Sequence, residues 1–444
     1  MLARFRVTAE REKPTIGGRN EVVHVREHQT YCRHWRSPAI SYISQRDCRT
    51  VVSRRVAAAG IWKGAVMILI SNGGSNSSVT ETPSDSIAIG TVDGVSILTR
   101  INGSWSVTDK VLRGCSISAV TQLDDGTLFA ASHGVGVARS LDGGRSWAWK
   151  NSGISHFDLW SARAGKLSGR DVVCVGSLPA HLYISEDRGE TWRELPALRQ
   201  VPSVSKWCFP PAPHIGHVKD IVFNGDTLMV GIEIGGLLIS KDFGASFTEL
   251  PVDPNPVECD IHRILVHKDR PGRVIVANGI VGVMSSDDGG RNWTKKTMPP
   301  RSDYPDAMVL DPLAPDVVYL SVGDGWPPHW YERGRARGKI LCSHDGGETW
   351  KRLLGGLPDG QRALFSALSI EASPRGSMLY AADTDGQVFE STNGGENWSI
   401  IADVAPVSKG EFYRGLVKDR IKLANVDDLV LSDSAAKRFE ATTV

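Results

Sequence analysis

The sequence has no excess of charge of either sign. It carries 51 Lys and Arg residues against 50 Asp and Glu residues, and the formal net charge over 444 residues is +1. A near-neutral chain gives no electrostatic reason to expect a nucleic acid partner. No apolar run approaches the roughly 20 residues that a membrane-spanning helix needs. These absences argue against nucleic acid binding and against a membrane span.

Cysteine is scarce and scattered. The seven cysteines are odd in number and form no C-x-x-C pair, which favours a reducing compartment over a disulfide framework. We therefore expect a cytoplasmic protein. Export stays open, because Arg54 and Arg55 precede a short apolar run that Lys63 interrupts.

Three common catalytic signatures are missing as well. The sequence has no phosphate-binding loop, no Ser-centred nucleophile elbow and no dinucleotide fingerprint. Each of these needs fixed glycines or a fixed nucleophile at set spacing. Their absence removes kinase, serine hydrolase and Rossmann-type interpretations.

Glycine is abundant, at 46 residues, and much of it lies in a repeated motif. The pattern S-x-D-x-G-x-[ST]-W and its variants recur at intervals of 45 to 57 residues, beginning at Ser140, Ser185, Ser240, Ser286, Ser343 and Ser391. A fixed period of about this size indicates a repeat architecture.

One repeat is built from four short runs separated by turn residues. The unit that ends at Trp147 contains the runs ISAVTQL, TLFAAS, VARS and SWAWK, with DDG, HGVG and LDGGR between them. Runs rich in β-branched and aromatic residues, bounded by Gly and Asp, predict strands and tight turns. Four antiparallel strands repeated radially form a β-propeller blade.

The repeated motif is expected to lie on the hairpin between the third and fourth strands. In SHDGGETW, Asp345 can accept hydrogen bonds from its own turn, and Gly346 and Gly347 permit positive φ. Thr349 can bond back to the aspartate, and Trp350 is expected to pack between blades. A calcium loop is excluded, because the spacing lacks the required acidic ligands. The motif therefore predicts a folding device.

The motif resembles the Asp-box, or BNR, repeat over about residues 85–400. The resemblance implies a propeller of the sialidase/WD40/YVTN/BNR-like superfamily. Families with such boxes include sialidases, xyloglucan-type hydrolases, the sortilin receptor domain and a photosystem II assembly factor, so the resemblance leaves the function open. The F-R-[IL]-P motif of sialidases is absent, and the chain has room for one propeller where the xyloglucanases resemble two in tandem.

The fold expectation is all-β, a seven-bladed β-propeller of four-stranded antiparallel blades with Asp-box hairpins. Residues 85–419 are assigned to the propeller, and residues 67–84 to a linker. Residues 1–66 hold 13 Lys and Arg against 5 Asp and Glu, and are expected to be disordered or to precede a true start at Met67. Residues 420–444 are expected to be a tail.

The predicted number of blades depends on how the first repeat is completed, because that repeat lacks a clear first strand. The alternating stretch 410–419 is expected to supply that strand and so to close the ring, which removes exposed sheet edges. Six or eight blades are the alternatives.

Polar residues align at the expected starts of successive inner strands. His156, His217, His262 and Asp306 hold this place in four blades. If they converge, His156, His217 and His262 predict a transition metal site for Zn, Fe or Mn. Alternatively His217, Glu233, His262 and Asp306 serve as acid–base groups without a metal. A polar ring around a water-filled channel is the ordinary alternative.

Two insertions, at residues 196–216 and 323–338, enlarge the same face of the expected ring. They are rich in aromatic and charged side chains, which suit a flat or anionic ligand or a sugar. A cap without a ligand is the alternative. The candidate ligand-binding residues are Trp207, His214, Asp324, Trp326, His329, Trp330, Tyr331 and Arg333.

Two functions follow from these patterns. The first is a hydrolase, glycosidase-like or metal-assisted, that acts on a small molecule or glycan at the propeller mouth. The second is a non-catalytic binding or assembly scaffold that recognises a protein partner or a glycan.

Overall fold

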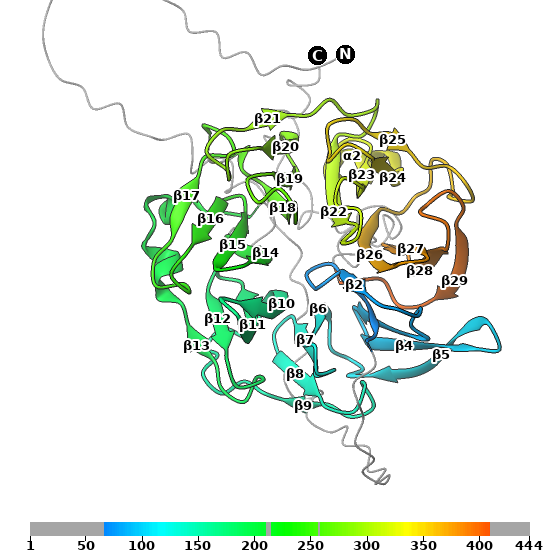
Figure 1. Ribbon diagram of the computed structural model, residues 1–444, viewed down its shortest axis with the longest axis horizontal. Helices are drawn as coiled ribbons and strands as arrows, with labels where there is room; N and C mark the ends of the chain where they lie inside the picture. Colours follow the sequence, from blue (N-terminus) through cyan, green and yellow to red (C-terminus); the bar gives the residue numbers. More distant parts are fainter. Residues whose placement is uncertain (1–65, 210–214, 256–257, 409–444) are drawn as a thin grey trace, which may run out of the picture.

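The computed structural model describes residues 66–209, 215–255 and 258–408. In these ranges the chain forms seven sheets arranged in a ring, with the first strand of each blade nearest the centre (Figure 1). This confirms the predicted seven-bladed, all-β propeller.

Five blades follow one pattern of four consecutive antiparallel strands. Blade 2 holds β6 (Ile117–Gln122), β7 (Leu128–Ser132), β8 (Gly136–Ser140) and β9 (Ala148–Trp149). Blade 3 holds β10 (Leu159–Leu167), β11 (Arg170–Ser177), β12 (Leu182–Ser185) and β13 (Arg193–Glu194). Blade 4 holds β14 (His217–Asn224), β15 (Thr227–Glu233), β16 (Gly236–Ser240) and β17 (Thr248–Leu250).

Blades 5 and 6 continue this pattern. Blade 5 holds β18 (Ile261–Val266), β19 (Val274–Asn278), β20 (Gly282–Ser286) and β21 (Thr294–Lys295). Blade 6 holds β22 (Tyr304–Leu310), β23 (Val318–Gly323), β24 (Lys339–Ser343) and β25 (Lys351–Arg352). The two insertions hold three helical segments: η2 (Pro196–Gln200), η3 (Pro202–Lys206) and α2 (Pro327–Arg333).

Blades 1 and 7 depart from the pattern because each receives a strand from the stretch expected to be a linker. Blade 7 holds β26 (Phe365–Ser373), β27 (Gly376–Asp383), β28 (Gln387–Ser391) and β29 (Ser399–Asp403), and β2 (Ser77–Val79) runs parallel to β26. Blade 1 holds β3 (Ser86–Thr91), β4 (Gly94–Ile101) and β5 (Ser104–Val111), and β1 (Ile68–Ile70) runs parallel to β3 at the inner position.

The linker assignment of residues 67–84 is therefore wrong. Ile68 and Ile70 are fully buried between blades 7 and 1. This burial holds the segment in the propeller, and the run MILI was too short to predict a strand from sequence. The closing strand expected at 410–419 lies outside the described residues. Just before it, Val92 N–H donates to the carbonyl of Pro406, so the end of the described chain returns to blade 1.

The core is divided among the blade interfaces, with one apolar cluster between each pair of neighbouring blades. The Asp-box tryptophans contribute to these clusters, as Trp350 does between blades 5 and 6. This is the expected way for stacked repeats to bury faces that a single blade cannot bury alone.

The Asp-box hairpin has the predicted internal bonds. Gly347 N–H donates to Ser343 Oγ at 2.8 Å, and Thr349 N–H donates to Asp345 Oδ1 at 2.9 Å. The indole N–H of Trp350 donates to the Gly347 carbonyl, and Gly347 has a φ of +86°. The folding role assigned to the motif is confirmed in these bonds.

Six of the inner strands carry a β-bulge close to their first residues. A bulge re-aims the side chain of the extra residue. The residues at the bulges are Ser118, Trp160, Lys219, His262, Asp306, Ala307 and Ser366. The bulges thus place a ring of mostly polar residues at one end of the inner strands.

The segment 71–76, which we call the crossing segment, lies inside the ring and joins blades that are far apart in the sequence. The Nδ2 group of Asn72 donates to the Ser366 carbonyl of blade 7 at 2.8 Å, and Oδ1 of Asn72 accepts from Lys219 Nζ of blade 4 at 3.1 Å. The Gly73 carbonyl accepts from Ala162 of blade 3. The crossing segment therefore ties the inner strands together from within.

The described cysteines differ in state. Cys115, Cys174, Cys259 and Cys342 are free and buried. Cys208 is disulfide-bonded, which the expectation of unpaired cysteines did not anticipate.

Candidate functional site

A cluster of buried charged and imidazole side chains lies where blades 4, 5 and 6 meet, at the bulged ends of the inner strands. His217 begins β14 and pairs in register with Glu233, the last residue of β15. Asp260 directly precedes β18, and His262 sits at the bulge of that strand. Asp306 sits at the bulge of β22. Each residue reaches the cluster because its strand begins or ends there.

Glu233 is the residue that connects the two histidines. Its Oε2 lies 3.1 Å from His217 Nε2 and 3.2 Å from Lys219 Nζ. Its Oε1 lies 3.9 Å from His262 Nε2. One carboxylate oxygen thus faces the cation of Lys219, and the other faces the second imidazole.

The orientation of His262 fixes its tautomer. Nδ1 lies 2.7 Å from the carbonyl oxygen of Pro305. A carbonyl oxygen can only accept, so Nδ1 carries the proton. Nε2 then faces Asp260 Oδ1 at 3.3 Å and Glu233 Oε1 at 3.9 Å. The Tyr304 hydroxyl lies 3.4 Å from the same Nε2 and can donate to it. Two carboxylate oxygens around an imidazole lone pair repel one another, and a proton or a metal ion between them would remove this repulsion.

The cluster is almost completely withdrawn from solvent. His217 and His262 are 0% exposed, Glu233 is 4% exposed and Asp260 is 7% exposed. Asp260 Oδ1 and His217 Nδ1 are buried without a hydrogen-bond partner among the described residues. Burial of polar atoms without partners is costly, so the cluster calls for an additional bonded group.

The cluster combines ionisable groups of both signs. Among the described residues, the buried carboxylates of Glu233, Asp260 and Asp306 lie with the buried ammonium group of Lys219. Burial lowers the pKa of His217, although Glu233 acts against this effect. The two carboxylates that face His262 Nε2 favour positive charge at that point.

Aromatic rings cover the imidazole of His217. The ring of Trp160 lies 3.8 Å away between centroids, and the ring of Phe209 meets it edge-on at 4.8 Å. Trp160 occupies the bulge of blade 3. The side of the cluster toward blade 3 is therefore apolar.

The structure brings together the four residues proposed as acid–base groups, His217, Glu233, His262 and Asp306. Sequence reasoning missed Asp260. The signal was present as Asp-x-His in the stretch CDIHRILV, because residues two apart near the start of a strand can face the same side.

The three histidines predicted as metal ligands, His156, His217 and His262, do not form one group of ligand atoms among the described residues, and a group of another composition forms around His262. In the part of the chain that the structure describes, one group of residues has ligand atoms close enough to share a metal ion. It consists of Glu233, Asp260 and His262, whose ligand atoms lie within 4.8 Å of one another. His156 lies three residues before β10 and stacks on His181 at 3.9 Å. His156 lies away from the cluster because β10 begins at Leu159 and not at His156 as expected.

The insertion at 323–338 uses its aromatic residues mainly for packing. Trp330 lies in α2, is fully buried and packs edge-on against Tyr304 at 5.1 Å. Its indole N–H donates to the Asp324 carbonyl at 2.9 Å. The prediction that Trp330 stacks on a ligand is therefore wrong, because its ring is part of the core. Asp324 pairs with Arg333 at 3.3 Å.

The remaining candidates are placed as follows. Trp207 donates its indole N–H to Ser203 Oγ at 2.8 Å and packs against the core between blades 3 and 4. Trp326 directly precedes α2 and His329 lies within it, and both are half-buried. His214 and the side chain of Tyr331 lie outside the described part of the structure.

Comparisons with known proteins agree with this architecture. A family model of the BNR/Asp-box repeat matches residues 341–352. No curated protein matches the chain by sequence. Among the described residues, no helix is long and apolar enough to cross a membrane.

Solved structures with the same fold have low sequence identity. The GH74 xyloglucanase from Xanthomonas campestris is 18% identical, with a TM-score of 0.56, over 76% of this chain and 55% of that protein. The GH74 enzyme from Niastella koreensis is 17% identical, with a TM-score of 0.51, over 74% of this chain and 54% of that protein. YCF48 bound to D1 peptide is 16% identical, with a TM-score of 0.44, over 71% of this chain and 96% of that chain.

The protein is therefore a seven-bladed β-propeller with a match to the BNR/Asp-box repeat at residues 341–352. It spans about half the length of the two GH74 enzymes. At these identities the likeness concerns the fold alone.

Proposed function

We propose that the protein is a metal-assisted hydrolase whose divalent transition metal ion is held by Glu233, Asp260 and His262. The observation that carries the proposal is the pair of buried carboxylates facing the unprotonated Nε2 of His262. A cation at this point removes the repulsion between the three acceptors. It also supplies a partner for the buried Oδ1 of Asp260.

The ligand chemistry suits Zn, Fe or Mn, which bind imidazole together with carboxylates. The Nδ1–H bond from His262 to the Pro305 carbonyl is the kind of outer contact that orients a metal-binding histidine. Lys219 and His217 contact the other oxygen of Glu233, and so hold the carboxylate in place while Oε1 stays directed at His262.

Three protein ligands leave a coordination position for water, and a bound metal ion makes that water a nucleophile near neutral pH. The ammonium group of Lys219 would stabilise negative charge that develops beside it. The substrate class that we propose is a small molecule or glycan that reaches the cluster from the bulged end of the ring.

The burial of the site favours a different function. His217 and His262 are 0% exposed, so a substrate must displace covering groups to reach them. In this second proposal the protein is a non-catalytic binding or assembly scaffold, and His262 is held between Asp260, Glu233 and the Pro305 carbonyl without a metal ion. The cluster then serves to hold blades 4, 5 and 6 together.

Elemental mass spectrometry separates the two proposals. We would measure the full chain without a His tag, beside Asp260→Asn and the control Asp226→Asn, which alters an exposed aspartate on the turn of blade 4. About one equivalent of a transition metal in the wild type and the control, lost in Asp260→Asn, supports the metal site. Metal-dependent turnover of aryl glycosides or lactones then supports the hydrolase.

The contrary result is equally informative. If no metal accompanies the wild type and none binds when Zn or Mn is added, the metal-assisted hydrolase is wrong. Metal-free acid–base chemistry by His217, Glu233, His262 and Asp306 and the scaffold function then remain, and screening of aryl glycosides or lactones without metal separates them.

A further inference from the structure

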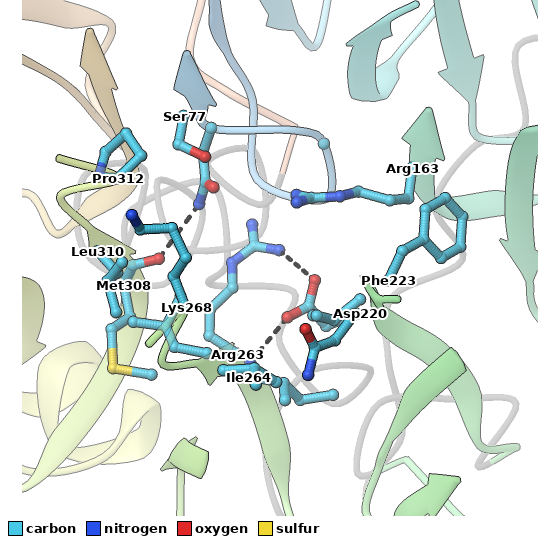
Figure 2. A pocket seen from close by; sticks show the side chains of 16 residues that line it. Ser77, Arg163, Asp220, Phe223, Arg263, Ile264, Lys268, Met308, Leu310 and Pro312 are labelled. Atoms are coloured by element: carbon cyan, nitrogen blue, oxygen red, sulfur yellow. Dashed lines mark hydrogen bonds and ion pairs between the residues drawn. The ribbon is translucent and has the colours of Figure 1, made fainter. Parts of the chain in front are cut away.

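A polar pocket opens beside the inner strands, lined by residues that follow the bulges of β14 and β18. It has a volume of about 260 Å³ and is lined by side chains of β10, β14, β18 and β22 (Figure 2). Gly74, Asn76 and Ser77, at the end of the crossing segment and the start of β2, form part of its wall. The pocket is separate from the cluster around His262.

One arginine of the pocket is fixed by an aspartate. Arg263 is 4% exposed, and its Nη1 donates to Asp220 Oδ1 at 3.0 Å. The other oxygen of Asp220 accepts from the backbone N–H of Ile264 at 2.8 Å. Both oxygens of Asp220 are therefore engaged with β18.

The second arginine of the pocket is not engaged in this way. Arg163 extends from β10 into the pocket opposite Arg263, and no hydrogen bond or ion pair links it to the other residues drawn (Figure 2). Burial lowers the pKa of Arg163, and the nearby charge of Arg263 adds to this effect, while Asp220 opposes it. Two guanidinium groups thus share one carboxylate.

A third cation lies at the rim. Lys268 lines the pocket and is exposed, with Asp269 as its ion-pair partner at 3.4 Å. Asn76 is already committed, because its amide donates to the Met308 carbonyl. The ionised groups that line the pocket are therefore Arg163, Arg263, Lys268 and Asp220, with an excess of positive charge.

We propose that this pocket binds a small oxyanion, the phosphate or carboxylate group of a small molecule, between Arg163 and Arg263. A guanidinium group offers a planar fork of donors that matches such groups, and its charge strengthens each bond. The pocket volume suits a small anion better than a drug-sized ligand. The oxyanion replaces the partner that Arg163 lacks among the pocket residues, and it offsets the repulsion from Arg263.

The proposal does not rest on the metal-assisted hydrolase, because none of the pocket residues belongs to the group Glu233, Asp260 and His262. The test uses the full chain at low ionic strength, with inorganic phosphate and succinate as probes in isothermal titration calorimetry. The variant is Arg163→Gln. The control is Arg375→Gln, which removes an exposed arginine on the turn between β26 and β27 and makes the same change in net charge.

We expect the wild type and Arg375→Gln to bind at least one probe, and Arg163→Gln to bind it about tenfold or more weakly, as expected for a lost charge-assisted bond. Binding of phosphate alone identifies a phosphate group as the ligand chemistry, and binding of succinate alone identifies a carboxylate. Arg163→Lys, which keeps the charge and loses the fork, should also bind weakly.

The proposal is overturned if neither probe binds at concentrations up to about 10 mM, which corresponds to negligible affinity for a built site. It is also overturned if Arg163→Gln binds as tightly as the wild type. Folding is checked by thermal unfolding: because Arg163 has no partner among the pocket residues, Arg163→Gln should unfold at the wild-type temperature or above it. Arg163→Lys provides the binding test if that variant does not fold.

Discussion

His262 Nε2 lies 3.3 Å from Asp260 Oδ1, while the opposite nitrogen of the same ring donates to the Pro305 carbonyl. The ring is therefore oriented from blade 6 and presents an acceptor to two acids of blades 4 and 5. A proton or a metal ion at Nε2 would remove the repulsion among these acceptors, and the Tyr304 hydroxyl also faces this nitrogen at 3.4 Å. This arrangement makes the stability of the propeller sensitive to the group that occupies that point.

Added metal should stabilise the folded protein. A ligand that binds only the native state stabilises it by about 2.7 kcal/mol at one hundred times its dissociation constant, so Zn²⁺ or Mn²⁺ should raise the unfolding temperature of the wild type by several degrees. Asp260→Asn should lose this increase, and Asp226→Asn should keep it. Equal increases in all three proteins would show that the metal binds elsewhere.

Substitution of Gly73 should weaken the contact between the crossing segment and blade 3. A Cβ atom at this position would lie 2.0 Å from the Trp160 carbonyl oxygen, and a backbone atom cannot give way as a flexible side chain can. We expect Gly73→Ala to destabilise the fold by about 2–4 kcal/mol in urea unfolding, at the upper end of overpacking costs.

A matched glycine separates the steric effect from the backbone effect. Gly103 has a φ of +81°, and a Cβ atom added there would meet no other atom within 4 Å. Gly103→Ala should therefore cost only the strain of the left-handed conformation, about 1–2 kcal/mol. If Gly73→Ala costs no more than Gly103→Ala, the close approach of the crossing segment to Trp160 is not tight in solution.

Asp383 should make stability fall as pH rises. It is 1% exposed, and burial raises the pKa of its carboxyl group to about 6, against the hydrogen bonds from Gln387 and Asp385. The folded state therefore holds a proton that the unfolded state releases near pH 3.8. The stabilisation that the protonated Asp383 gives to the folded state is fully present below pH 3.8 and is lost as pH rises through about 6.

Asp383→Asn removes this dependence and keeps an oxygen that can accept from Gln387 N–H and Asp385 N–H. We expect the variant to be more stable than the wild type by about 2–3 kcal/mol at pH 8, and by little at pH 4. Urea midpoints at the two pH values measure the difference. A constant difference at both pH values would contradict the raised pKa.

Asp345 should act in the opposite direction. Partial burial raises the pKa of this carboxyl group, but hydrogen bonds from Thr349 and Ser343 outweigh it and lower the pKa to about 2. Its stabilising contribution is present above pH 3.8 and is lost as pH falls through about 2. Because the side chain is exposed, solvent screening keeps the contribution below about 1 kcal/mol.

Asp345→Asn tests this effect, and Asn393 shows that an amide can hold the same place in the blade 7 box. The variant should unfold slightly below the wild-type temperature at pH 7, and the gap should close near pH 2. If the difference in unfolding temperature persists at pH 2, the amide destabilises the protein by disturbing the turn geometry, and the loss of the carboxylate charge is not the cause.

The sequence was sufficient for the blade and insufficient for the contacts between blades. The Asp-box bonds of Asp345 join atoms no more than four residues apart, so the motif carries its structure locally. The convergence of His217, Glu233, His262 and Asp306 was predictable because the repeat places equivalent residues at one end of the ring. The same reasoning misplaced His156. β10 begins at Leu159, where it pairs with β11, and the repeat motif does not fix this start.

The sequence by itself determined the all-β repeat and the turn chemistry, because these depend on periods and on bonds within a few residues. The count of seven blades and the closure of the ring needed the tertiary structure, because β1 comes from residues that showed no repeat. Tertiary structure alone decided that residues 71–76 lie inside the ring, since Asn72 and Lys219 meet across 147 positions. It also decided that Asp260 joins His262 and that Arg163 faces Arg263. Contacts between separate blades depend on strand register and on ring closure, which leave no local pattern in the chain.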